Sequence, residues 1–131
     1  MIVVDASALT EFLLQTELGS RVERRLYKSD EDLHAPHLLD VEVLSALRRL
    51  VQAREVDTER AEAALEDLQL LRIIRHGHLA LVAHAWDLRQ NFTAYDAMYL
   101  ALAEALDATV VTCDQPFAGA SRRAARVELI R

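Results

Sequence analysis

The chain has 131 residues, of which 52% are hydrophobic, and this is enough for one packed core but short for two domains. Its formal charge of −6, from 15 basic and 21 acidic residues, excludes a whole-surface attraction to nucleic acid, so a polyanion would need local basic patches or a metal. The single cysteine, Cys113, cannot form an internal disulfide, which fits a reducing cytoplasm. The start of the chain does not resemble a signal peptide, and no apolar run is long enough to cross a bilayer. We expect one cytoplasmic domain over residues 1–131, with no membrane partner.

The first third of the chain predicts a strand, two helices and a second strand. The β-branched run Ile2–Val4 indicates a strand buried on both faces, and it ends at Asp5. Ser7 is expected to cap the next helix, whose apolar side is formed by Leu9, Phe12 and Leu13. A helix over 20–27 would turn Val22 and Leu26 inward and a basic face outward. Pro36 favours an extended backbone before it, which predicts a strand over 33–35.

The middle of the chain predicts three helices and another strand. Between 37 and 53, apolar residues recur at helical spacing and predict a helix with Glu42 in its first turns. The buried face of this helix would be formed by Leu38, Val41, Leu44, Leu47 and Val51. Asp57 is typical of a helix N-cap, and Arg72–Arg75 is expected to form a short strand after that helix. A further helix over 79–88 would bury Leu79, Val82, Ala83 and Trp86.

An almost entirely apolar helix is expected from Thr93 to Leu106, covered on every side by other elements. Its first turn carries Asp96, which Thr93 would cap. A carboxylate at this place also complements the helix dipole, so Asp96 alone does not distinguish a cap from a catalytic group.

The last quarter repeats the pattern of the first strand. Thr109–Val111 is again β-branched and leads to Asp114, as the first strand leads to Asp5. We expect a short helix after Pro116 that carries Arg122, Arg123 and Arg126, and a final strand from 127 to 130.

Alternating strands and helices predict an α/β fold, in which a parallel sheet of about five short strands lies between helix layers on both faces. Ligands of such sheets bind at the carboxyl ends of the strands. Two acids end strands, and two lie at the start of helices on the same edge, so four carboxylates should converge: Asp5, Glu42, Asp96 and Asp114.

Four carboxylates in one place repel one another, and they must take up protons, find basic partners or bind a cation. Oxygen ligands are those that Mg²⁺ and Mn²⁺ prefer. Such a metal can polarise a phosphoryl oxygen and activate water, which favours a hydrolytic nuclease.

The motifs around these acids resemble those of PIN-domain ribonucleases, in particular the VapC toxins of bacterial toxin–antitoxin pairs. The resemblance spans essentially the whole chain and is carried by Val3–Ser7, by Glu42 after Pro36, by Thr93–Ala103 and by Thr112–Asp114. It implies a PIN-like three-layer sandwich and an endoribonuclease that depends on Mg²⁺ or Mn²⁺. It also implies a homodimer whose cognate antitoxin obstructs the active site.

The resemblance assigns roles to individual residues. Asp5 and Asp96 would be the main metal ligands, and Glu42 and Asp114 would complete the pocket directly or through water. Ser7, Thr93 and Thr112 would support them. Arginines are candidates for RNA phosphate contacts, although each also suits a solvated surface: Arg48, Arg49, Arg89, Arg122 and Arg123.

Other functions fit the sequence less well. A phosphorylated receiver domain needs a lysine near its acids, and the chain has only Lys28; a dehalogenase-type phosphatase needs a second aspartate where Ser7 stands. A zinc site is disfavoured because the histidines are scattered, and we expect loop and surface positions for His34, His37, His76, His78 and His84. A non-catalytic module that binds a metal and an antitoxin remains the alternative.

Overall fold

A five-stranded parallel sheet forms the centre of the computed structural model, which describes residues 1–120 and 125–131. The strand order is β3-β2-β1-β4-β5, and each neighbouring pair is parallel. The strands are β1 (Ile2–Val4), β2 (Leu33–Pro36), β3 (Ile73–His76), β4 (Thr109–Thr112) and β5 (Arg126–Leu129). The predicted α/β class and all five short strands are confirmed.

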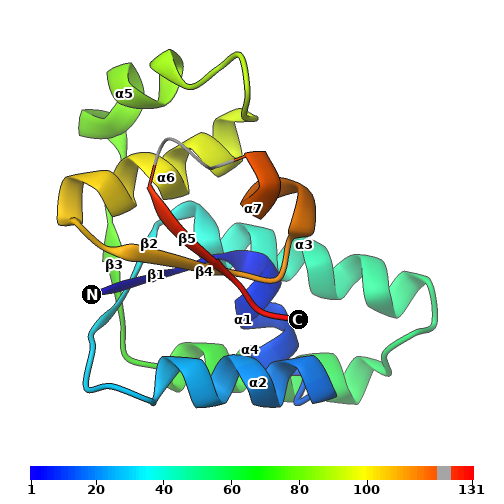
Figure 1. The fold of residues 1–131 in the computed structure, drawn as a ribbon. Coiled ribbons are helices and arrows are strands. Elements are labelled where there is room, and N and C mark those ends of the chain that lie inside the picture. The colour runs from blue at the N-terminus through cyan, green and yellow to red at the C-terminus, as the bar shows by residue number, and fades with distance from the viewer. Residues whose placement is uncertain (121–124) are drawn as a thin grey trace.

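Helices cover both faces of the sheet, as Figure 1 shows. One face carries α5 (Val82–Asp87) and α6 (Ala94–Leu106), and the other carries α1 (Ala6–Leu13), α2 (Glu17–Leu26) and α4 (Thr58–Leu70). The remaining elements are α3 (Leu38–Gln52), the 3-10 turn η1 (Leu79–Leu81) and α7 (Gln115–Ala120). The three-layer arrangement leaves β1 in the middle of the sheet and in the middle of the layers.

The centre of the sheet is apolar because both of its faces are covered. All three residues of β1 are fully buried, and Val3 and Val4 pair in register with Val110 and Val111 of β4. Continuous β-branched runs suit such strands, since neither face meets water. These two neighbouring strands determine where the chain segments that follow them begin.

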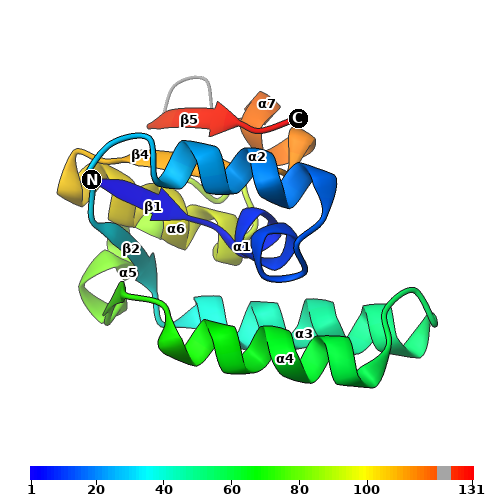
Figure 2. The ribbon, with the colours of Figure 1, turned by 90° about the horizontal axis from the view of Figure 1, so that it is seen from below.

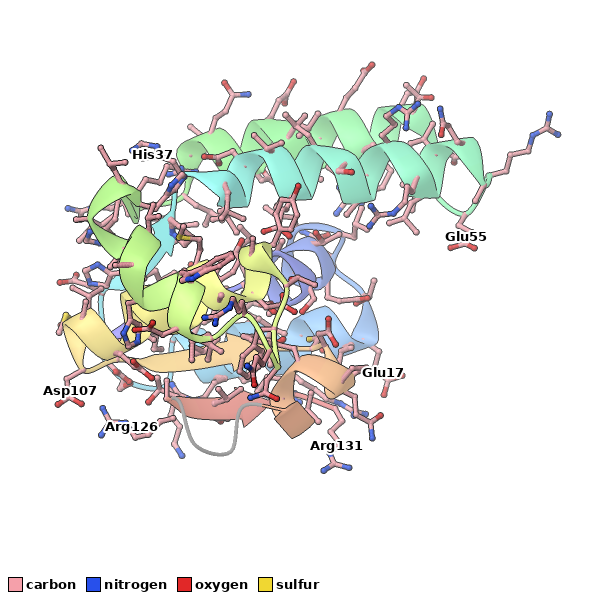
Figure 3. All side chains as sticks on the ribbon, turned by 90° about the horizontal axis from the view of Figure 1, so that it is seen from above. Glu17, His37, Glu55, Asp107, Arg126 and Arg131 are labelled. Atoms are coloured by element: carbon pink, nitrogen blue, oxygen red, sulfur yellow. The ribbon has the colours of Figure 1, made fainter. Side chains whose placement is uncertain are left out.

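Helices α3 and α4 form an antiparallel hairpin that extends beyond the sheet, as Figures 2 and 3 show, with Glu55 at its tip. The buried face of α3 consists of Leu39, Val43 and Leu47. The prediction of Val41 and Leu44 as buried positions is wrong, because they are 66% and 50% exposed. Helical spacing allows several apolar rows on one helix, and packing against the rest of the fold selects which of them is buried.

Helix α6 is buried along most of its length, as predicted, but not on every side. Its core residues include Ala97, Tyr99 and Leu100, whereas Tyr95 is 61% exposed. The first turn lies at the edge of the sheet, which leaves Tyr95 largely in contact with solvent. At the other end, Asp107 takes a left-handed φ of 50° and accepts a 3.1 Å hydrogen bond from Arg126, two residues that Figure 3 labels close together.

The segment before α6 and the end of the chain differ from the prediction. Instead of one helix over 79–88 with a buried apolar face, η1 and α5 leave Leu79 and Trp86 87% and 64% exposed. Arg126 lies in β5 rather than in a helix, and Arg122 and Arg123 lie outside the described residues. No helix among residues 1–120 and 125–131 is both long and apolar enough to span a membrane.

The prediction that the histidines are loop and surface residues is wrong for two of them. His34 lies in β2 and is buried, and its Nδ1 lies 2.8 Å from Nε2 of His76 in β3. Parallel pairing of β2 with β3 brings the two rings together, because His76 lies opposite Pro36 across the pair. Burial and the charge of His76 lower the pKa of His34, which favours the neutral form of the His34 ring.

Candidate active site

The four predicted acids lie together at the edge of the sheet where the strands end. Asp5 follows β1, Asp114 follows β4, Asp96 lies in the first turn of α6 and Glu42 lies in the second turn of α3. All four line one cavity of about 580 Å³. The cause is topological: parallel strands bring their carboxyl ends to one edge, and the helix that leads back to β4 starts there.

Asp5 is held in place by three hydrogen bonds from protein donors. Its Oδ1 accepts from the Ala8 amide at 2.9 Å and from the Ser7 hydroxyl at 2.7 Å, and its Oδ2 accepts from the Thr112 hydroxyl. Asp5 itself is therefore the N-cap of α1, and the prediction of Ser7 as the cap is wrong. A carboxylate has about four lone-pair sites, so one remains for a ligand.

The electrostatic environment of Asp5 opposes its charged form. Burial raises its pKa to about 6, although the three hydrogen bonds act in the opposite direction, and the charge of Asp114 raises it further. Without a cation, this carboxylate therefore takes up a proton at a higher pH than an exposed aspartate does.

The hydroxyls of Ser7 and Thr112 join the ends of β1 and β4. Each accepts a 2.9 Å hydrogen bond from an amide after β4, Ser7 from Cys113 and Thr112 from Asp114. Asp114 in turn accepts from the Phe117 amide at 3.1 Å. The backbone at the two strand ends is therefore fixed by the same side chains that hold the carboxylate of Asp5.

Glu42 and Tyr99 have buried oxygen atoms without a hydrogen-bond partner among the described residues, namely Oε1 of Glu42 and the hydroxyl oxygen of Tyr99. Burial raises the pKa of Glu42, as do the charges of Asp5 and Asp96. The Tyr99 hydroxyl acts in the opposite direction on this pKa, yet no hydrogen bond of ordinary geometry joins the two side chains. A buried oxygen without a partner is costly, which indicates a place for a ligand.

Asp96 combines the two roles that its sequence position allowed. Its amide donates to the Thr93 hydroxyl at 3.2 Å, so Thr93 caps α6 as predicted. Its side chain lies in the cavity, where burial and the charge of Asp114 raise its pKa. The cap therefore fixes the helix start that brings this carboxylate to the other three.

The side chains of the cavity have the chemistry of a cation site, but they are not arranged as a coordination shell. None of the ion pairs among the described residues includes any of the four acids, so their charge is not neutralised. As the side chains stand, no three acidic, histidine or cysteine groups in the described part of the chain are arranged to hold an ion. An all-oxygen donor set, the unpartnered buried Oε1 of Glu42 and the raised pKa values of Asp5, Glu42 and Asp96 still fit a hard divalent cation, provided that the side chains rotate toward it.

The predicted RNA-binding arginines differ in their position relative to the cavity. Arg49 lines the cavity, whereas Arg48 and Arg89 do not, and Arg89 lies over the ring of Trp86. The structure adds Tyr95, Tyr99 and Cys113 to the lining, and burial raises the pKa of Cys113 to about 12. Tyr99 could have been found from the sequence, because it lies one helical turn after Asp96 and so shares its face.

Comparison with known proteins agrees with this geometry. The family model of the PIN domain matches residues 2–122. Ribonuclease VapC1 of Mycobacterium tuberculosis is 42% identical over 130 residues, which cover 98% of this chain and 97% of that protein. The chain is a VapC-type member of the PIN-domain family.

Solved structures have the same fold as this PIN domain. The M. tuberculosis toxin VapC20, described as cleaving the sarcin–ricin loop, has a TM-score of 0.68 and 16% identity and covers 96% of this chain and 99% of its own. FitAB bound to an IR36 DNA fragment has a TM-score of 0.65 and 22% identity, with 98% and 94% covered. At these identities the likeness concerns the fold alone, and it confirms the predicted PIN-like sandwich.

Proposed function

We propose that this protein is an endoribonuclease dependent on Mg²⁺ or Mn²⁺, and that it is the toxin of a toxin–antitoxin pair. The observation that carries the proposal is the convergence of Asp5, Glu42, Asp96 and Asp114 on one cavity without a basic partner among the described residues. The names of the curated relatives, which are ribonucleases of the VapC type, support RNA as the substrate.

The four acids would hold the metal, with Asp5 and Asp96 as its main ligands. When bound, the metal would polarise a phosphoryl oxygen and favour the ionised form of water. Hydrogen bonds from Ser7, Thr112 and the Ala8 amide fix the direction of Asp5. Burial raises the pKa of Glu42, which makes its free Oε1 suitable for accepting a proton from attacking water.

The partners follow from family membership. We propose a cognate antitoxin that obstructs the cavity, a homodimer as the assembled toxin, and a cytoplasmic location. Residues 1–131 would act as a single nuclease domain. Among the predicted arginines, Arg49 is the proposed phosphate ligand, because it lines the cavity beside the acids.

A cleavage assay tests the activity. Protein purified free of antitoxin and metal is incubated with structured RNA, with and without Mg²⁺ or Mn²⁺. Wild type should cut RNA only with metal, and Asp96→Asn should abolish cleavage without lowering the melting temperature, since it removes a repelling charge. Asp107→Asn, at the other end of α6, should cut like wild type, because Asp107 is exposed and does not line the cavity.

The alternative is a non-catalytic module that binds a metal and an antitoxin. It predicts no metal-dependent cleavage from a folded, antitoxin-free preparation. A second adverse outcome would be an unfolded Asp96→Asn variant whose refolded fraction still cuts RNA, since Asp96 would then serve the helix cap and not the reaction.

A further inference from the structure

The lining of the active-site cavity combines acidic, basic and apolar side chains. Five acids line it, namely the four already described and Glu11, and Arg49 is the only basic residue among the described residues of the lining. Apolar and aromatic side chains complete it, among them Leu18, Val41 and Tyr95. A cavity with acidic, apolar and basic parts suits a substrate in which charged phosphate groups alternate with the rings of bases.

Arg49 lies on the same face of α3 as Glu42. The two residues are seven positions apart, or about two helical turns, which places their Cα atoms about 10 Å apart along the helix axis. Between them, Ser45 accepts a 3.3 Å hydrogen bond from Nη1 of Arg49. No ion pair among the described residues includes Arg49, so its charge is available to an anion next to the reacting one.

Tyr95 directly precedes Asp96 in the first turn of α6, and it also lines the cavity. Its side chain is 61% exposed, while that of Tyr99, one turn further on, is 2% exposed. Tyr95 is thus a solvent-accessible part of the lining, and it directly precedes a proposed metal ligand in the sequence. Aromatic rings in such places stack on unpaired bases, and this contact is tolerant of base identity.

We propose that Tyr95 and Arg49 form a subsite for the nucleotide adjacent to the scissile bond, in which Tyr95 stacks on its base and Arg49 binds its phosphate. The inference rests on the proposed ribonuclease function and narrows its substrate to RNA that is single-stranded at the cut. Local recognition of this kind also explains how a chain with a charge of −6 retains a polyanion.

The test measures binding in the full-length Asp96→Asn background, by fluorescence anisotropy of a labelled single-stranded RNA of random sequence. Tyr95→Ala should weaken binding by at least about fivefold, whereas Tyr95→Phe, which keeps the ring, should bind like the parent. With an oligomer of the same length that lacks bases, the difference between Tyr95→Ala and Tyr95→Phe should vanish.

The arginine is tested by the salt dependence of the same binding. Arg49→Ala should reduce the slope of log K against log salt by about 0.7, which corresponds to one lost contact on a single strand. Arg48→Ala is the matched control, because Arg48 is the exposed neighbour that does not line the cavity, and its slope should not change. Equal binding by Tyr95→Ala and Tyr95→Phe, or equal slopes for the two arginine variants, would overturn the subsite. Failure of the proposed nuclease function would instead appear as the absence of RNA cleavage by wild type. The binding measurements do not depend on cleavage, so the two failures can be distinguished.

Discussion

The hydroxyl of Thr112, at the end of β4, donates a hydrogen bond to Oδ2 of Asp5, at the end of the neighbouring strand β1. The same hydroxyl oxygen accepts from the Asp114 amide at 2.9 Å. One buried side chain therefore sets the direction of the first acid and the backbone of the last. This explains how residues about a hundred positions apart form one site.

Thr112→Val tests the role of the hydroxyl, because it removes this group and keeps the shape of the side chain. The valine has almost the same volume, but it leaves Oδ2 of Asp5 and the Asp114 amide without this partner, at a cost of about 1–3 kcal/mol. We expect lower stability in urea and a loss of cleavage of about tenfold. Thr112→Ser keeps the hydroxyl and should retain most of the activity, and equal activity of both variants would argue against the positioning role.

Asp5 should make the metal-free protein less stable as the pH rises. Its pKa in the fold is about 6, above the ordinary value of 3.8 for an aspartate, so the folded state holds this proton more tightly. Its contribution to stability is fully present below about pH 3.8 and is lost as the pH rises through about 6. Asp5→Asn should therefore gain stability over wild type at pH 8, by up to about 3 kcal/mol, since a tenfold change in proton affinity corresponds to about 1.4 kcal/mol.

The comparison is made by urea unfolding in EDTA at pH 5 and pH 8. The gain of Asp5→Asn over wild type should be larger at pH 8 than at pH 5. An equal gain in stability at both pH values would show that the fold does not disfavour the ionised form of Asp5.

Tyr99→Phe should not destabilise the metal-free protein. The hydroxyl is buried and has no hydrogen-bond partner among residues 1–120 and 125–131. Its removal relieves a desolvated polar group, so the variant should equal wild type in stability or exceed it by about 1 kcal/mol. Tyr95→Phe is the control on the same helix and should be neutral, since Tyr95 is exposed. A loss of more than about 1 kcal/mol for Tyr99→Phe would indicate that the hydroxyl donates to Glu42 in solution.

Gly19 is required where α1 and α2 cross. A Cβ atom at this position would lie 2.0 Å from the carbonyl oxygen of Glu11, a backbone atom that cannot move aside easily. Gly19→Ala should therefore cost at least about 1–3 kcal/mol in urea unfolding. Gly77→Ala is the control, because nothing lies within 4 Å of a Cβ there, and it should be close to neutral. Similar stability of the two variants would contradict the close helix crossing.

The placement of the acids was predictable from local sequence, whereas their detailed surroundings were not. The β-branched runs before Asp5 and Asp114 are local signals, and the parallel sheet brings any two such strand ends to the same edge. Glu42 was predicted from its place in the first turns of a helix that follows a strand, and the family resemblance distinguished it from Asp40.

Contacts between distant segments account for the wrong predictions. The pairing of His34 with His76 depends on the register of β2 and β3, which the sequence of neither strand reveals. Asp40, in the first turn of α3, accepts two hydrogen bonds of 2.7 and 2.8 Å from Arg75 of β3, a contact that the spacing along α3 does not predict. The exposed positions of Val41 and Leu44 likewise depend on which side of α3 meets the rest of the fold.

Titration of metal-free protein with Mn²⁺ by isothermal calorimetry tests the central claim most directly, namely that the four acids form a cation site. Wild type should bind Mn²⁺ at pH 7.5, and Asp5→Asn and Asp96→Asn should each bind at least tenfold more weakly, while Asp107→Asn should bind like wild type. Binding of equal strength by wild type and by folded Asp5→Asn and Asp96→Asn variants would contradict the account.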